Sequence, residues 1–168
     1  VGGDLAFLKC LCKRVIELGA LDRDFIAEHT TGFESLLAEL DATPWDALLA
    51  AAGVPRETVD EIAQLYAQSP ATIACWGMGI TQHRDSVATI QMIVNLLLLR
   101  GQIGKPGAGV CPVRGHSNVQ GDRTMGIWEA PPEGFLDRLG AEFGFEPPRA
   151  HGLDTVGTIE AMLAGQVK

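Results

Sequence analysis

The sequence predicts a helix-rich α/β fold with one buried strand near residues 72–76. Two observations support this fold class. Apolar residues recur at three- and four-residue steps through the first 70 residues, which is the period of helices packed on a core. A short apolar run then lies between Pro70 and two closely spaced glycines. Such a run is typical of a strand covered on both faces, as in a parallel sheet.

Residues 1–70 form the first, helical part of the chain. Asp22 is a residue type that caps helices, Gly53 is one that ends them, and Pro55 is suited to opening the next helix. Together with the apolar spacing, these signals predict helices over residues 4–18, 32–40, 44–52 and 55–66, with a short helix after residue 22.

Residues 71–126 form a second part, in which a strand, a turn and a helix precede a long loop. The helix predicted over residues 87–100 is apolar on nearly every side, so it should pack between layers. Residues 101–126 are rich in glycine and predict a site-forming loop. Residues 127–168 predict two further helices, over 134–143 and 156–163. Both ends of the sequence favour a single partial domain cut from a larger chain.

The turn after the strand is the first candidate site. Gly77 and Gly79 match the first two positions of a dinucleotide-binding fingerprint, but Gln82 occupies the third. An acidic residue that would hold a ribose is also missing near residues 97–102. A standard nicotinamide site is therefore not expected. Two interpretations stay open, a phosphate-binding turn and a tight turn that merely connects packed elements.

The second candidate site is residues 111–124. This segment carries Arg114, Arg123, His116 and several amides on one glycine-hinged stretch. A guanidinium suits anions because its planar fork stays charged and bonds in two places. The alternative is a solvated loop whose side chains cap its own backbone.

Composition excludes several function classes. The net charge of −8 argues against nucleic acid, which needs clustered Lys and Arg. The longest apolar stretch, residues 87–99, is too short and too interrupted to span a membrane. We expect no signal peptide and a cytoplasmic location with reduced cysteines. The histidines and cysteines lack a zinc-like spacing, so no metal ligand is expected in this chain.

Three ordered segments resemble signatures of the large molybdopterin oxidoreductases, which include formate dehydrogenases, periplasmic-type nitrate reductases and dimethyl sulfoxide reductase. The segments are residues 76–83 (WGMGITQH), 99–109 (LRGQIGKPGAG) and 112–121 (PVRGHSNVQG). The third is most similar to the formate dehydrogenase branch, and residues 4–6 and 25–34 also resemble it. The resemblance implies an internal segment of a formate dehydrogenase-like large (alpha) subunit, with the fold of domains 1–3 of the formate dehydrogenase/dimethyl sulfoxide reductase type.

The resemblance also implies a cofactor and roles for individual residues. Members of this family bind two molybdopterin guanine dinucleotides (bis-MGD) around one molybdenum, whose protein ligand lies outside this chain. Arg114 matches the arginine beside the molybdenum, and His116 lies where formate dehydrogenases have Gln, so both are candidate catalytic residues. The residues expected to bind the cofactor are Gly77, Met78, Gly79, Gln82, Gly115 and Asn118.

We expect the isolated segment to be inactive and to hold no cofactor, because several domains of the same subunit hold the pterins in this family. Those domains are its expected partners, and the electron-transfer partner is unknown. The alternative function from a different class is a non-catalytic helical module that serves structure or binds a partner. Molybdenum analysis of the full-length protein separates the two.

Overall fold

The computed structural model describes residues 2–128, 130–150 and 152–167, and the chain divides into two units, residues 1–115 and residues 116–168. Each unit is described by itself. The prediction that all of these residues belong to one partial domain of a larger chain stays a prediction.

The helices expected in residues 1–70 all form within a few residues of their predicted bounds. Asp22 caps the second of them, because its carboxylate accepts a hydrogen bond from the Phe25 backbone N–H at 3.0 Å. Gly53 ends the fourth with a φ of 70°, a left-handed conformation that favours glycine. The helices are α1 (Asp4–Glu17), α2 (Arg23–His29), α3 (Phe33–Ala42), α4 (Trp45–Ala52) and α5 (Arg56–Gln68).

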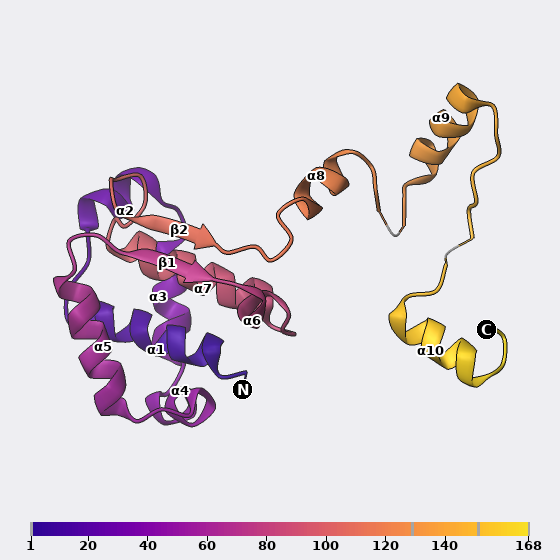
Figure 1. Ribbon diagram of the computed structural model, residues 1–168. Coiled ribbons are helices and arrows are strands. Elements are labelled where there is room, and N and C mark those ends of the chain that lie inside the picture. The colour runs from indigo at the N-terminus through magenta and orange to yellow at the C-terminus, as the bar shows by residue number, and fades with distance from the viewer. Residues whose placement is uncertain (1, 129, 151, 168) are drawn as a thin grey trace. The chain divides into compact units, whose positions relative to one another are not determined.

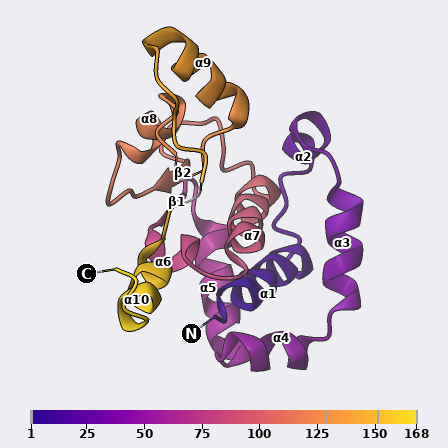
Figure 2. The same cartoon turned by 90° about the vertical axis from the view of Figure 1, so that its right-hand side faces the viewer.

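The core of the first unit lies around α1, which has α7 (Ser86–Leu99) beside it and α3, α4 and α5 around it (Figures 1 and 2). Cys10, Cys12 and Val15 on α1 are fully buried, and α3 contributes the fully buried Leu40. Six residues of α7 are buried as well, which agrees with the expectation that this apolar helix packs between other elements.

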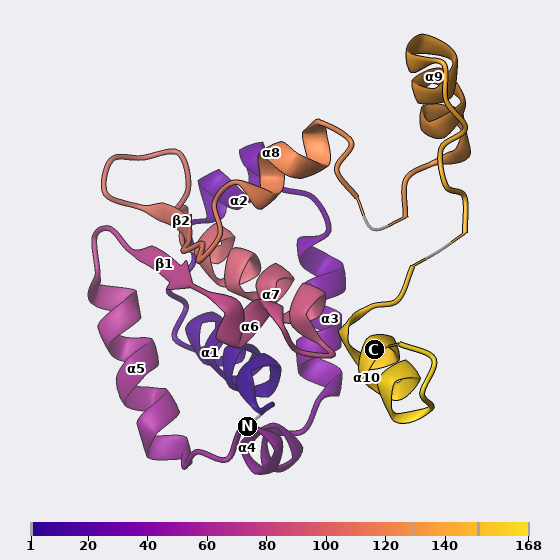
Figure 3. The same cartoon turned by 45° about the vertical axis from the view of Figure 1, so that its right-hand side comes forward.

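A two-stranded parallel sheet completes the first unit. Strand β1 (Ile73–Trp76) pairs with β2 (Gly109–Pro112), and the chain crosses between them through α6 (Met78–Thr81) and α7 (Figure 3). A crossover helix is the usual way to join parallel strands. The predicted parallel-type strand therefore forms, and the predicted turn at 77–82 contains the short helix α6.

The expectation that the strand is buried was wrong. Ile73 has 54% of its surface exposed, Cys75 is exposed, and Ala74 and Trp76 are only half-buried. The reason is that the sheet has just two strands in the part of the chain that the structure describes. The buried core is built from helices alone, which pack on one another and leave the sheet largely uncovered.

One buried polar side chain fixes the entry into β1. Gln102 has only 1% of its surface exposed, and its Oε1 accepts a hydrogen bond from the Thr72 backbone N–H at 2.9 Å. The Thr72 carbonyl in turn accepts from Gly109 N–H at 3.0 Å, where β2 begins. Gln102 is thus a satisfied buried group that aligns the starts of both strands.

The interpretation of residues 101–126 as one long loop also needs correction. This stretch contains β2 and α8 (Val119–Thr124). The stretch is rich in glycine and proline, so its composition does not indicate a strand. β2 is defined by its hydrogen bonds to β1 rather than by its own composition.

The second unit contains α8, α9 (Glu133–Phe143) and α10 (Thr155–Leu163), of which the last two were predicted. The Asp154 carboxylate caps α10 by accepting from Gly157 N–H at 2.7 Å. Arg149 binds three carboxylates, those of Glu133, Asp137 and Glu146. Among the described residues of the whole chain, no helix is long and apolar enough to cross a membrane.

Candidate functional site

The two candidate segments meet at the carboxyl edge of the parallel sheet. Gly77 follows β1 and Val113 follows β2. The Val113 backbone N–H donates to the Trp76 carbonyl at 2.7 Å, so the two exits from the sheet are hydrogen-bonded together. A Cβ atom on Gly77 would lie 3.6 Å from the Val113 carbonyl oxygen, in ordinary van der Waals contact. Ligands of open α/β sheets bind characteristically at this edge.

The second segment lies beside the side chains of the first just beyond this edge. A Cβ on Gly115 would lie 3.9 Å from the Met78 methyl carbon, which places the end of the second segment beside the first. Met78 itself is 52% exposed. The Gln82 amide lies one helical turn further, with its Nε2 3.6 Å from the Met78 sulfur. A Cβ on Gly79 would meet no atom within 4 Å, so α6 has open space on that side.

Arg114 is a cation at this edge. Its side chain is exposed, and it makes no hydrogen bond or ion pair with the residues that the structure describes. An exposed guanidinium with its donors unused can take an anion in a two-pronged contact.

The predicted site residues are divided between the two units. Gly77, Met78, Gly79, Gln82, Arg114 and Gly115 belong to the first unit and lie at or just beyond the same edge. His116 and Asn118 belong to the second unit, at the start of α8. The His116 carbonyl accepts from Val119 N–H at 3.4 Å, and the Asn118 carbonyl accepts from Asp122 N–H at 2.9 Å. Their proposed roles remain predictions.

Sequence reasoning missed a pair of cysteines in the sheet. Cys75 and Cys111 are register partners on β1 and β2, and both are exposed free thiols. Cys111 lies in the stretch of residues 101–126 that the sequence predicts as a loop. Because β2 carried no strand signal of its own, nothing in the sequence indicated that these two residues lie side by side.

A small hollow of about 110 Å³ behind the turn was also missed. It lies between the start of α1 and the connection from α6 to α7, and it is lined by charged and polar groups that include Asp4, His83, Arg84 and Asp85. His83 follows Gln82 directly, so its place beside the candidate turn could have been read from the sequence. Its place in a hollow that residues at the start of α1 also line could not.

Comparison with known proteins adds relatives along the whole chain. No family model matches. An uncharacterized oxidoreductase of Mycobacterium bovis is 48% identical over 99% of this chain and 22% of its own length. Protein YdeP of Escherichia coli K12 is 44% identical over 100% of this chain and 24% of its own length. Formate dehydrogenase H of the same organism is 36% identical over 74% of this chain and 18% of its own length. The chain therefore spans less than a quarter of the length of these relatives.

Proposed function

The chain belongs to the molybdopterin oxidoreductase family, and we propose that it forms part of the large catalytic subunit of a formate dehydrogenase-like enzyme. The proposed reaction is the two-electron oxidation of a small substrate, with formate as the family's default. The remaining domains of the same subunit are its proposed partners. When bound, the molybdenum of the pterin cofactor supplies the redox chemistry by accepting the electron pair.

The observation that carries this proposal is the parallel pairing of β1 and β2. Two segments about 35 residues apart in sequence leave the sheet at the same edge, joined by the hydrogen bond from Val113 to Trp76. Both segments match the motifs on which the family resemblance rests. A family-type cofactor site requires both motifs to face one ligand, and parallel strands meet this requirement because their carboxyl ends share an edge.

The residues at this edge fit a molybdopterin guanine dinucleotide by their chemistry. The dinucleotide carries heterocycles with amide-like edges, which call for groups that both donate and accept hydrogen bonds. The Gln82 amide meets this need. The open space beside Gly79 leaves room for close approach to the backbone. The exposed Met78 offers a polarisable thioether to a flat ring.

Arg114 has the proposed task of binding the substrate anion. Formate carries one negative charge, and a fixed guanidinium can hold its two oxygens and keep the anion oriented during electron transfer. Gly115 follows directly and gives the backbone freedom to turn there. The second catalytic candidate is His116, and its identity affects which substrate is proposed. A histidine stands here where formate dehydrogenases have Gln, so the main alternative to formate is another small substrate.

The test is steady-state kinetics of Arg114→Lys and Arg114→Ala in the full-length protein, with molybdenum measured in the same samples. Lysine keeps the charge but loses the two-pronged geometry, so kcat/KM should fall for lysine and fall further for alanine. Losing one such contact costs about 2–4 kcal/mol of transition-state stabilisation. Molybdenum content should stay near that of the parent protein, because many other groups hold the pterins.

Arg138→Ala is the matched control. Arg138 is an exposed arginine on α9, and removing it should leave both kinetics and molybdenum content unchanged. Unchanged kcat/KM in Arg114→Ala at full molybdenum loading would remove Arg114 from the mechanism. Loss of molybdenum in that variant would instead make Arg114 a cofactor-holding residue. A full-length protein that purifies without molybdenum or pterin under conditions that load other members of the family would refute the proposed function itself.

A further inference from the structure

Two thiols lie side by side on the exposed sheet. Cys75 on β1 and Cys111 on β2 are direct register partners, and in a parallel sheet such partners project from the same face. Both residues are exposed, and both are free cysteines. The residue of β1 that precedes Cys75 on that face is Ile73, which is exposed too. Its register partner on β2 is Gly109, so no bulky side chain of β2 lies beside the cysteines.

We propose that Cys75 and Cys111 form a redox-active dithiol, which a peroxide oxidises to an intrachain disulfide across the sheet. The geometry permits this bond. Neighbouring strands lie about 4.8 Å apart, and disulfides join residues whose Cα atoms are about 4.4–6.8 Å apart. The Cα separation is therefore in range, and the two Cβ atoms must move somewhat closer together than the strand spacing, because bonded cysteines have Cβ atoms about 3.5–4.5 Å apart.

The chemistry balances with hydrogen peroxide as the oxidant. The thiolate of one cysteine attacks a peroxide oxygen, the O–O bond breaks, and the released hydroxide takes a proton to become water. The sulfenic acid that results is attacked by the second sulfur. An S–S bond forms, the S–O bond breaks, and a second water leaves. In sum, two thiols and one peroxide give one disulfide and two waters, and a thiol reductant reverses the change.

The reaction is selective for this pair. Cys10 and Cys12 on α1 are both fully buried, and burial raises the pKa of each thiol. Burial keeps peroxide away from both thiols, and this difference in access separates them from the exposed pair. The pKa of Cys75 is also raised, by partial desolvation and by the adjacent Cys111 thiol. Oxidation of the exposed pair should therefore speed up as the pH rises above neutral, because more thiolate is then present.

The disulfide would link the two strands that the crossover segment connects. The positions that follow the two cysteines, Trp76 and Pro112, are the last residues of β1 and β2, and the candidate site begins directly after them. A disulfide would tie the two strand ends together next to that site. It would also raise the thermal unfolding midpoint, because it restricts the unfolded chain between residues 75 and 111.

The experiment is peptide mapping by mass spectrometry, without reductant, after the reduced protein is treated with one equivalent of hydrogen peroxide. The expected product is one linked peptide pair joining Cys75 to Cys111, with the loss of two hydrogen atoms and reversal by dithiothreitol. In Cys75→Ser, a dimedone adduct should form on Cys111, and in Cys111→Ser the adduct should form on Cys75. Alkylation of Cys10 and Cys12 should require prior unfolding.

Three results would overturn the proposal. They are the absence of a link between residues 75 and 111, a product in which either cysteine is joined mainly to Cys10 or Cys12, and disulfide-linked dimers formed in place of the intrachain bond. The measurement needs no molybdenum and no substrate. Its failure would therefore leave the proposed oxidoreductase function untouched, and failure of that function would leave the dithiol in place.

Discussion

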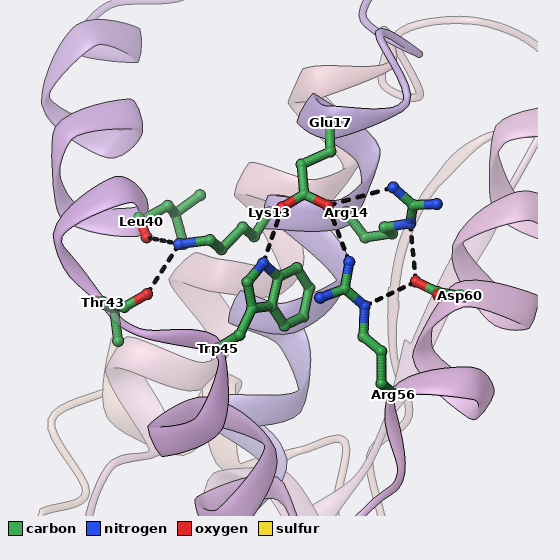
Figure 4. A network of polar contacts seen from close by, with 8 residues as sticks. All are labelled: Lys13, Arg14, Glu17, Leu40, Thr43, Trp45, Arg56 and Asp60. Atoms are coloured by element: carbon green, nitrogen blue, oxygen red, sulfur yellow. Dashed lines mark hydrogen bonds and ion pairs between the residues drawn. The ribbon is translucent and has the colours of Figure 1, made fainter.

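Glu17 joins three helices of the first unit, and its removal should cost more stability than its exposed position suggests. Its carboxylate accepts from the Trp45 indole N–H at 2.8 Å, from Arg56 at 3.0 Å and from Arg14 at 3.2 Å (Figure 4). The Arg56 guanidinium also stacks 3.5 Å from the centre of the Trp45 ring. One carboxylate at the end of α1 therefore holds the start of α4 and the start of α5.

The magnitude follows from the three contacts. Part of each ionic side chain is exposed, 22% for Arg14, 32% for Arg56 and 35% for Glu17, so solvent screens the charge attraction. Exposed ion pairs contribute about 0.2–1 kcal/mol each, and a hydrogen bond to a charged group contributes about 1.5–3 kcal/mol before such screening. After that discount, Glu17→Ala should lower the free energy of unfolding by about 1–2 kcal/mol.

Urea unfolding followed by circular dichroism measures this cost. Glu39→Ala is the matched control, because Glu39 is 55% exposed and forms a single ion pair, with Lys9 at 2.6 Å. That control should lose no more than about 0.5 kcal/mol. If the two variants unfold at the same urea concentration, the contacts of Glu17 do not act together and the reasoning fails. High salt should narrow the difference only in part, since the bond from Trp45 is not an ion pair.

Two further predictions concern other side chains on the helices. Leu40→Ala should cost about 2–5 kcal/mol in urea unfolding, because Leu40 is fully buried and its loss leaves a cavity; Leu163→Ala, at a side chain with 84% exposure, should stay within about 0.5 kcal/mol of the parent. Asp60 predicts an acid dependence, because its hydrogen bond with Arg56 holds the pKa of its carboxyl below the ordinary value. The parent protein should have a higher free energy of unfolding than Asp60→Asn. This difference should be fully present above the ordinary aspartate pKa of about 3.9 and be lost as the pH falls through the lower pKa of the folded state. A difference that does not change with pH would contradict this.

The helices could be predicted because their signals are local. The apolar residues of α1 and α5 recur with the helical period, and Gly53 and Pro55 mark a boundary by their own backbone preferences. Such signals operate within a few residues. The predicted bounds of these elements therefore lie within about two residues of the observed ones, which is the usual uncertainty of helix ends.

The sheet could be predicted only in part because its properties depend on distant partners. β1 shows a strand signal in its own sequence, but whether it is buried depends on what packs against it, and the helices pack on one another instead. β2 has the composition of a loop and becomes a strand only by pairing with β1. The neighbourhood of Cys75 and Cys111 follows from that same pairing, so no pattern of spacing could have indicated it.

The candidate site depends on strand direction more than on either motif. β1 and β2 end at the register partners Trp76 and Pro112. Pro112 has no N–H to donate, and the next residue, Val113, closes the ladder with its bond to the Trp76 carbonyl. Beyond that bond both segments leave the sheet together, one toward Gly77 and the other toward Arg114. Antiparallel strands would have sent the two motifs to opposite edges. Each motif would then offer a ligand only its own hydrogen-bond donors. The crossover through α7 is therefore what brings two motifs distant in sequence to one edge of the sheet, where they form one candidate site.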